Sequence, residues 1–157
     1  MMRANLDGVS LCDADLVDTN LSDASLVGAR FDRAELMGAD FSNVNAHTAS
    51  FAGAELGGLE ATRADFTSAN FRGASLGGAV FWECTMRAAD LRDTRLERTV
   101  FFNSRVEGAQ VAGASGTACG PCQVADDVVL DSEDLERWFR EHGADVKIVS
   151  MDPNEDT

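Results

Sequence analysis

Residues 24–41 read ASLVGARFDRAELMGADF, and the five-residue step in this stretch runs through most of the chain. In each step a large apolar residue stands two positions after a small one, as Leu26 follows Ala24 and Phe31 follows Ala29. Between Leu6 and the end of the pattern, twenty-two consecutive steps keep this register with no slip. A repeat of this regularity outweighs local propensities as a predictor of the fold.

The period of five matches neither the helical period of 3.6 nor the strand period of 2. It fits a three-residue extended piece whose first and third side chains point inward, followed by a two-residue corner. Corner pairs such as Asp7-Gly8 and Ser42-Asn43 hold residue types that favour turns. Four such sides close a square coil of about twenty residues, and stacked coils pair their backbones at about 4.8 Å.

Two departures from the pattern indicate that the small and the large positions share one narrow core. The large position holds alanine at Ala46 and Ala61, and in both places the preceding small position is enlarged, to Val44 and Leu59. Because interiors are close-packed, volume lost at one position must be replaced nearby. The paired changes therefore predict that both columns of side chains face inward.

Several steps, among them Ala14-Asp15-Leu16 and Ala64-Asp65-Phe66, resemble the A(D/N)LXX pattern of the pentapeptide-repeat family. The resemblance covers about three quarters of the chain. It implies an all-β solenoid, a right-handed quadrilateral parallel β-helix over residues 1–116. With four steps in each coil, the solenoid should contain about five and a half coils, spaced as parallel strands are.

The five-residue period stops after Gly116, and residues 117–157 form the second part of the chain. We expect a loop over 117–123, an ambiguous apolar segment over 124–130 and a helix over about 132–142, capped by Asp131 or Ser132. A short strand over 146–151 and a disordered tail over 153–157 complete this part. The helix places three apolar residues on one face, to cover the last coil and to pair with a second copy in a homodimer: Leu135, Trp138 and Phe139.

The formal net charge of −14 is unevenly distributed. Residues 1–60 contain ten acidic and three basic residues, and residues 117–157 contain eleven and three, whereas the middle segment is close to neutral. Direct binding of nucleic acid requires an excess of Lys and Arg, so this composition argues against it. The sequence shows no signal peptide and no apolar run long enough to span a membrane, which leads us to expect a cytoplasmic protein.

The acidic excess of the first three coils gathers on two neighbouring sides. In the twenty-residue period, the middle positions of the third side and of the fourth side each form one outward column, and corner residues add to both. One interpretation is a set of solvated positions in a repeat that favours Asp at this slot. The other is an acidic stripe that binds a basic protein groove: Asp15, Asp18, Asp23, Glu35, Asp40, Glu55 and Glu60.

The sequence contains no arrangement that indicates catalysis, a metal site or a cofactor. Cys119-Gly120-Pro121-Cys122 has the spelling of a thioredoxin-like redox motif, but such a motif needs a strand–helix–strand frame that the remaining chain is too short to form. Zinc would need two further ligands. No triad order, phosphate loop or ligand cluster accompanies the carboxylates. We therefore expect a protein that is not an enzyme.

Besides a redox or metal site at Cys119 and Cys122, two functions remain open. The acidic solenoid, the terminal helix and the inferred dimer resemble the topoisomerase-interacting members of the family, the mycobacterial fluoroquinolone-resistance and Qnr-type proteins. That resemblance implies a DNA mimic that binds DNA gyrase or another type II topoisomerase, and inhibits it or protects it from poisons. Because the register is never interrupted by a loop of the Qnr kind, inhibition or self-resistance is favoured. The alternative is a protein-interaction scaffold with no link to topoisomerases.

Overall fold

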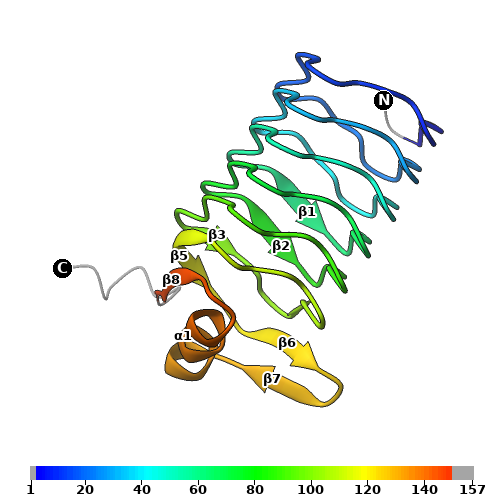
Figure 1. Ribbon diagram of the computed structural model, residues 1–157. Coiled ribbons are helices and arrows are strands. Elements are labelled where there is room, and N and C mark those ends of the chain that lie inside the picture. The colour runs from blue at the N-terminus through cyan, green and yellow to red at the C-terminus, as the bar shows by residue number, and fades with distance from the viewer. Residues whose placement is uncertain (1–2, 150–157) are drawn as a thin grey trace.

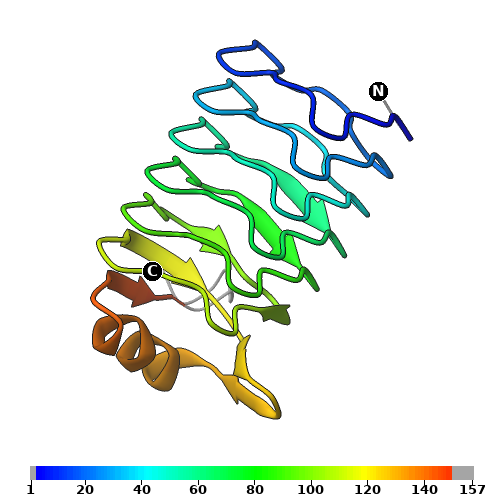
Figure 2. The same ribbon diagram turned by 45° about the vertical axis from the view of Figure 1, so that its right-hand side comes forward.

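A computed structural model describes residues 3–149, which form an elongated stack of square coils closed at one end by a helix (Figure 1). The coils follow one another in chain order, so the first coil and the helix lie at opposite ends of the molecule (Figure 2). The solenoid predicted from the five-residue step is confirmed. Parallel bridges join positions twenty residues apart, as in Asn5↔Ser25 and Ser25↔Asn45.

Each corner of the coil depends on one residue in the left-handed region. The second corner position of every step has a positive φ, for example +66° at Gly8, +59° at Asp13 and +57° at Asn43. Glycine and, to a lesser degree, Asp and Asn tolerate this conformation, which explains why the corners are rich in them. Such a corner turns the chain after three residues and therefore produces the square section.

Backbone hydrogen bonds run between coils along the solenoid axis. Leu6 N donates to Ser25 O at 2.8 Å, and Ser25 N donates to Ala4 O at 2.9 Å. Most sides are too short to count as strands. The coils toward the C-terminus contain regular ones, β1 (Glu60–Thr62), β2 (Val80–Trp82), β3 (Thr99–Val100) and β4 (Ser104–Arg105), and β1, β2 and β3 pair in parallel on the fourth side.

The core is a single narrow column of apolar side chains. Phe31, Phe51 and Phe71 stack above one another with ring centroids 5.2 and 5.0 Å apart. The compensating pairs behave as predicted, because Val44, Ala46, Leu59 and Ala61 are all at most 1% exposed. Volume is thus conserved within each coil, as close packing requires.

The expected loop over 117–123 is wrong, because the solenoid continues past Gly116. Strand β5 (Ser115–Cys119) pairs in parallel with β3, and β6 (Cys122–Ala125) pairs in parallel with β4. The backbone pairing continues while its spacing shrinks, from Arg95↔Ser115 to Val100↔Cys119 and Arg105↔Gln123. The sequence period is lost here because the last coil is shorter, although its hydrogen bonds are kept.

The remaining chain folds back over this end of the stack. Strand β7 (Val128–Leu130) forms an antiparallel hairpin with β6, which settles the ambiguous segment. Helix α1 (Ser132–Glu141) begins after the N-cap Asp131, whose side chain accepts a hydrogen bond from Ser132 N at 2.7 Å. Strand β8 (Asp145–Ile148) then pairs in parallel with β5. Residues 150 and 151 of the expected strand, and the tail over 153–157, lie outside the described residues.

Helix α1 and β8 cover the C-terminal coil (Figure 1). Leu135 is fully buried and Phe139 is 3% exposed, both within the solenoid core, whereas Trp138 is half-buried against it. The two buried side chains are therefore unavailable to a second copy of the chain. Among the described residues, no element covers the first coil, where Leu6 and Leu11 remain only partly buried.

Candidate functional site

The third side carries the first of the two acidic columns. Asp15 pairs with Glu35, and Glu35 pairs with Glu55, so the three side chains stand in register on successive coils. All three are exposed. At about 4.8 Å between coils, neighbouring carboxylates in such a column repel one another by roughly 1 kcal/mol in water.

The fourth side carries the second column, which pairs Asn20 with Asp40 and Asp40 with Glu60. Asp18 occupies the corner between the two sides with a φ of +55°. Its carboxylate lies against Gly38 on the next coil, where a Cβ atom would clash with it. The structure therefore brings the acidic side chains of both sides together around one edge of the solenoid.

The aspartates and the glutamates of this surface differ in the hydrogen bonds that their side chains form. Asp15 accepts a hydrogen bond from Val17 N at 3.3 Å, and Asp40 accepts one from Ser42 N at 2.9 Å and one from Asn20 Nδ2 at 3.0 Å. These bonds support the following corner. Within residues 3–149, the side chains of Glu35 and Glu60 form neither a hydrogen bond nor an ion pair. Their carboxylates are free for a partner.

Two members of the predicted stripe have basic neighbours. Arg95 reaches over one intervening coil to Glu55, with Nη2 3.5 Å from Oε1. Asp23, at the far corner of the fourth side, lies 3.7 Å from Arg3 Nε and accepts a hydrogen bond from Asn43 Nδ2 at 3.1 Å. Exposed pairs of this kind contribute little to stability. The unpaired part of the stripe is therefore centred on Glu35, Asp40 and Glu60.

Sequence reasoning missed that the edge between the two acidic columns, which carries Asp18, also exposes apolar side chains. Val17 is 39% exposed and Met37 is 45% exposed, at the same corner position on successive coils. The next residues of this corner column are Gly57 and Gly77, and the Met37 side chain lies 3.9 Å from the position of a Cβ at Gly57. The carboxylates thus flank a smooth apolar ridge that a partner surface can approach closely.

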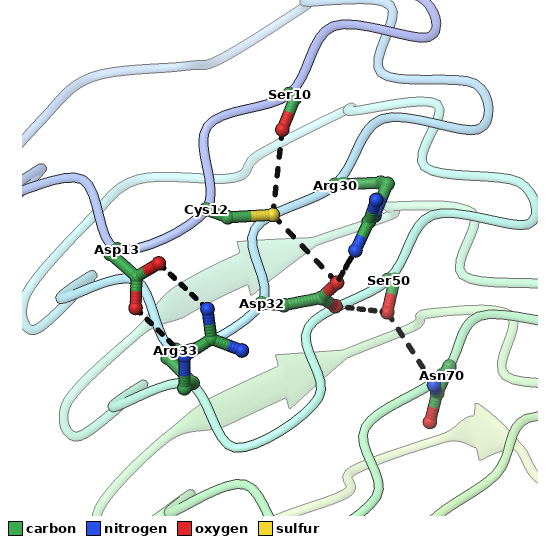
Figure 3. A network of polar contacts seen from close by, with 8 residues as sticks. All are labelled: Ser10, Cys12, Asp13, Arg30, Asp32, Arg33, Ser50 and Asn70. Carbon is green, nitrogen blue, oxygen red and sulfur yellow. Dashed lines mark hydrogen bonds and ion pairs between the residues drawn. The ribbon is translucent and has the colours of Figure 1, made fainter.

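A second polar cluster, on the second side and its corner, ties coils together (Figure 3). Asp32 accepts hydrogen bonds from Ser50 Oγ and from Arg30, whose Nη2 lies 2.7 Å away, and Cys12 Sγ lies 3.7 Å from it. Burial opposes ionisation of Asp32, but the bonds from Ser50 and Arg30 outweigh it, so its pKa lies below the usual value. Arg30 is two residues from Asp32, whereas Ser50 and Cys12 are 18 and 20 residues away, and this near-twenty spacing is the signal that could have revealed the cluster. Its satisfied hydrogen bonds indicate a structural role.

The two cysteines of the redox-like motif are part of the solenoid wall. Cys122 pairs with Ser104 and points into the core, and Cys119 pairs with Val100 and is 7% exposed. Burial raises the pKa of Cys122 to about 12 and also raises that of Cys119. Thiolate chemistry requires a lowered pKa and access to solvent, so this environment opposes it.

We expect only Cys12 to react quickly with a thiol reagent such as DTNB in the native protein at pH 8. Cys12 is half-buried, whereas Cys84, Cys119 and Cys122 are buried, and the pKa of Cys84 is raised to about 11. The other three thiols should react only after unfolding. The substitution Cys12→Ser should remove the fast phase, and fast labelling of Cys119 or Cys122 in that variant would contradict the burial of the motif.

No group of three or more His, Cys, Asp or Glu side chains in residues 3–149 is arranged to hold a metal ion. Of the helices in this range, none has the length and apolar character needed to cross a membrane.

Residues 4–43 and 47–82 match the sequence profile of pentapeptide repeats, in eight copies. The break at 44–46 coincides with Val44 and Ala46, and beyond residue 82 the small position holds Cys84, Thr94 and Thr99 in place of alanine. No curated protein sequence matches the chain significantly.

Several solved structures resemble this one. A trypsin-treated variant of QnrB1, described as a plasmid-mediated fluoroquinolone resistance protein, is 21% identical with a TM-score of 0.61, over 95% of this chain and 79% of that one. Full-length QnrB1 is 20% identical with a TM-score of 0.57, over 96% and 93%. HetL, a pentapeptide-repeat protein involved in heterocyst differentiation regulation in the cyanobacterium Nostoc sp. strain PCC 7120, is 22% identical with a TM-score of 0.40, over 75% and 56%. The likeness to QnrB1 establishes the right-handed β-helix.

Proposed function

Because this chain belongs to the pentapeptide-repeat family and bears two adjacent columns of carboxylates, we propose that it is a non-enzymatic DNA mimic that binds DNA gyrase or another type II topoisomerase. The observation that carries the proposal is the register of Glu35, Asp40, Glu55 and Glu60 on two neighbouring sides of consecutive coils. Support also comes from the fold shared with QnrB1, a fluoroquinolone resistance protein.

The charge density of this surface is of the same order as that of duplex DNA. In the two coils where both columns hold a carboxylate, Glu35 with Asp40 and Glu55 with Glu60, the surface has about one charge per 2.4 Å along the solenoid axis, since coils are spaced at about 4.8 Å. Duplex DNA has one charge per about 1.7 Å. A groove built to hold DNA through Lys and Arg side chains therefore meets a comparable row of anions, and the fixed coils present it without reorganisation.

The mutual repulsion of the stacked carboxylates also favours binding. Asp15 and Asp40 assist their corners, but in the described part of the chain Glu35 and Glu60 make no such bonds. A basic partner removes the repulsion along the column and pairs with the free glutamates. The smooth edge at Val17 and Met37 lets that partner approach both columns together.

Inhibition of supercoiling, or self-resistance, is the expected outcome rather than rescue of the Qnr kind. The bridges from Asn5 to Ser115 keep a twenty-residue spacing without an inserted loop. A homodimer through the C-terminal region belongs to this proposal. Since Leu135 and Phe139 are buried, such a contact would use the exposed Val128 and Val129 of the edge strand β7.

The test is a gyrase supercoiling assay with the purified protein. We expect half-inhibition at micromolar concentration, and loss of inhibition by at least about tenfold in the double variant Glu35→Lys with Glu55→Lys, because two attractive contacts become repulsive. The matched control, Glu133→Lys with Glu141→Lys on the exposed face of α1, changes the net charge equally and should retain inhibition. An equal loss of inhibition in both double variants would show that the effect depends on the net charge of the protein and not on the acidic stripe. No inhibition of several bacterial gyrases would favour a scaffold with another partner.

A further inference from the structure

A patch of four apolar side chains interrupts the polar surface of the fourth side. Of the middle positions of the steps from Asn5 to Ser115, only Val80 and Val100 are apolar, and they pair directly with each other in β2 and β3. Trp82 and Phe102, at the following corner, stack with ring centroids 4.2 Å apart and an interplanar angle of 21°. Trp82 is 37% exposed, and the other three are half-buried. We refer to these four residues as the aromatic patch.

The aromatic patch continues directly from the acidic column. Glu60, in the adjacent strand β1, pairs with Val80, and Asp40 lies one coil further toward the N-terminus. Glu83 is exposed next to Trp82. Within the described range, none of these three carboxylates has an ion-pair partner. The fourth side therefore reads, coil by coil, as two carboxylates followed by two apolar positions.

The spacing of these positions matches one face of an α-helix. Coils repeat every 4.8 Å or so, whereas side chains three and four residues apart on a helix are separated by about 4.5 and 6.0 Å along its axis. An extended strand laid along the same direction repeats its side chains on one face at about 6.6 Å and loses register after two coils. A helix that lies along the solenoid axis keeps register over the four coils concerned.

We infer that the fourth side binds an amphipathic α-helix of a partner protein, with apolar residues in one half of its contact face and basic residues in the other half. The apolar half covers Val80 and Val100 and contacts the stacked rings of Trp82 and Phe102. The basic half pairs with Glu60 and Asp40. Aromatic side chains that are rigid and partly exposed are typical anchors of such contacts. This inference does not require the partner to be a topoisomerase.

The test uses a fluorescein-labelled helical peptide of about eighteen residues, with Leu on one face of its first half and Lys on the same face of its second half. Its binding to the full chain is followed by anisotropy. A Trp138→Phe background leaves Trp82 as the single tryptophan, so its emission reports directly on the patch. We expect saturable binding with a shift of that emission. A peptide of the same composition, with Lys and Leu scattered over all faces, should bind at least about tenfold more weakly.

Substitutions locate the contact. The pair Trp82→Ala with Phe102→Ala should weaken binding at least about tenfold. Glu60→Gln should weaken it about threefold, an effect that 0.5 M salt removes. Trp82→Phe should retain most of the affinity and so controls for folding. Met37→Ser changes an exposed apolar residue at the other corner of the fourth side, and should leave binding unchanged.

Three results would overturn the inference. The first is peptide binding that survives the double alanine substitution in a folded protein. The second is saturation without any change in Trp82 emission. The third is a wild-type dimer that Trp82→Ala converts to a monomer, because the occupant would then be a second copy of this chain. Since the assay contains no gyrase, its failure leaves the supercoiling result untouched, and the reverse also holds.

Discussion

Phe51→Ala is expected to lower the free energy of unfolding by about 3–5 kcal/mol. The Phe51 ring is fully buried and stacks on Phe31 and Phe71 at 5.2 and 5.0 Å. It also approaches Phe41 at 5.8 Å. Truncation loses the transfer free energy of the ring and leaves a cavity in the narrow core. The neighbouring side chains cannot fill this cavity, because backbone hydrogen bonds hold the coils in place on all four sides.

The measurement is guanidinium-induced unfolding followed by far-UV circular dichroism, with the m-value compared between variants. Phe51→Leu is the matched control, because Leu11 and Leu91 occupy the same inward column on other coils. That substitution should cost only about 1 kcal/mol. A loss below about 1.5 kcal/mol for Phe51→Ala would show that the coils relax around the cavity, contrary to the rigid column described above.

Gly116→Ala should destabilise the protein by about 3 kcal/mol or more. Gly116 has a φ of +118°, which residues with a side chain rarely adopt. A Cβ atom there would lie 2.9 Å from Glu97 N and 3.1 Å from Leu96 C, both backbone atoms of the coil below. Strand β5 would have to move away from that coil, and β8, which pairs with β5, would move with it.

The control for this prediction is Gly73→Ala. Gly73 has a φ of +69°, but no atom outside its chain neighbours lies within 4 Å of an added Cβ. Only the conformational cost remains, roughly 1 kcal/mol. Unfolding experiments on both variants therefore separate backbone strain from the close approach of two coils. Equal losses would show that the contact with the coil below contributes nothing.

Most of the solenoid is predictable because the alternation of small and large side chains along the sequence follows the packing of the core. The five-residue step reports which positions face the core, and the compensation between Val44 and Ala46 confirms that two columns share it. The last coil escapes this reasoning. Its strands β5 and β6 keep their backbone bonds while the pairing distance along the chain falls below twenty residues. Hydrogen bonds between coils require only that two backbone segments lie side by side. They do not require a constant number of residues in each coil.

The acidic surface is predictable in outline for the same reason. A twenty-residue spacing places Glu35 beside Glu55 without any knowledge of the coordinates. The ion pair between Arg95 and Glu55 is not predictable, since it depends on how a long side chain crosses an intervening coil. The aromatic patch was present in the sequence as two apolar residues in polar positions, twenty apart. The charge pattern alone does not reveal it.

The two ends of the stack differ, because α1 and β8 cover the last coil and no element within residues 3–149 covers the first. Chain opening in such a stack starts where a layer has a neighbour on one side only, so the coil around Leu6 and Leu11 should be the first to fray. The acidic column of the third side begins at Asp15 in this first coil and continues into coils that have a neighbour on both sides. A partner that binds this acidic column would therefore also stabilise the first coil against local unfolding. Binding and N-terminal stability would then depend on the same few carboxylates.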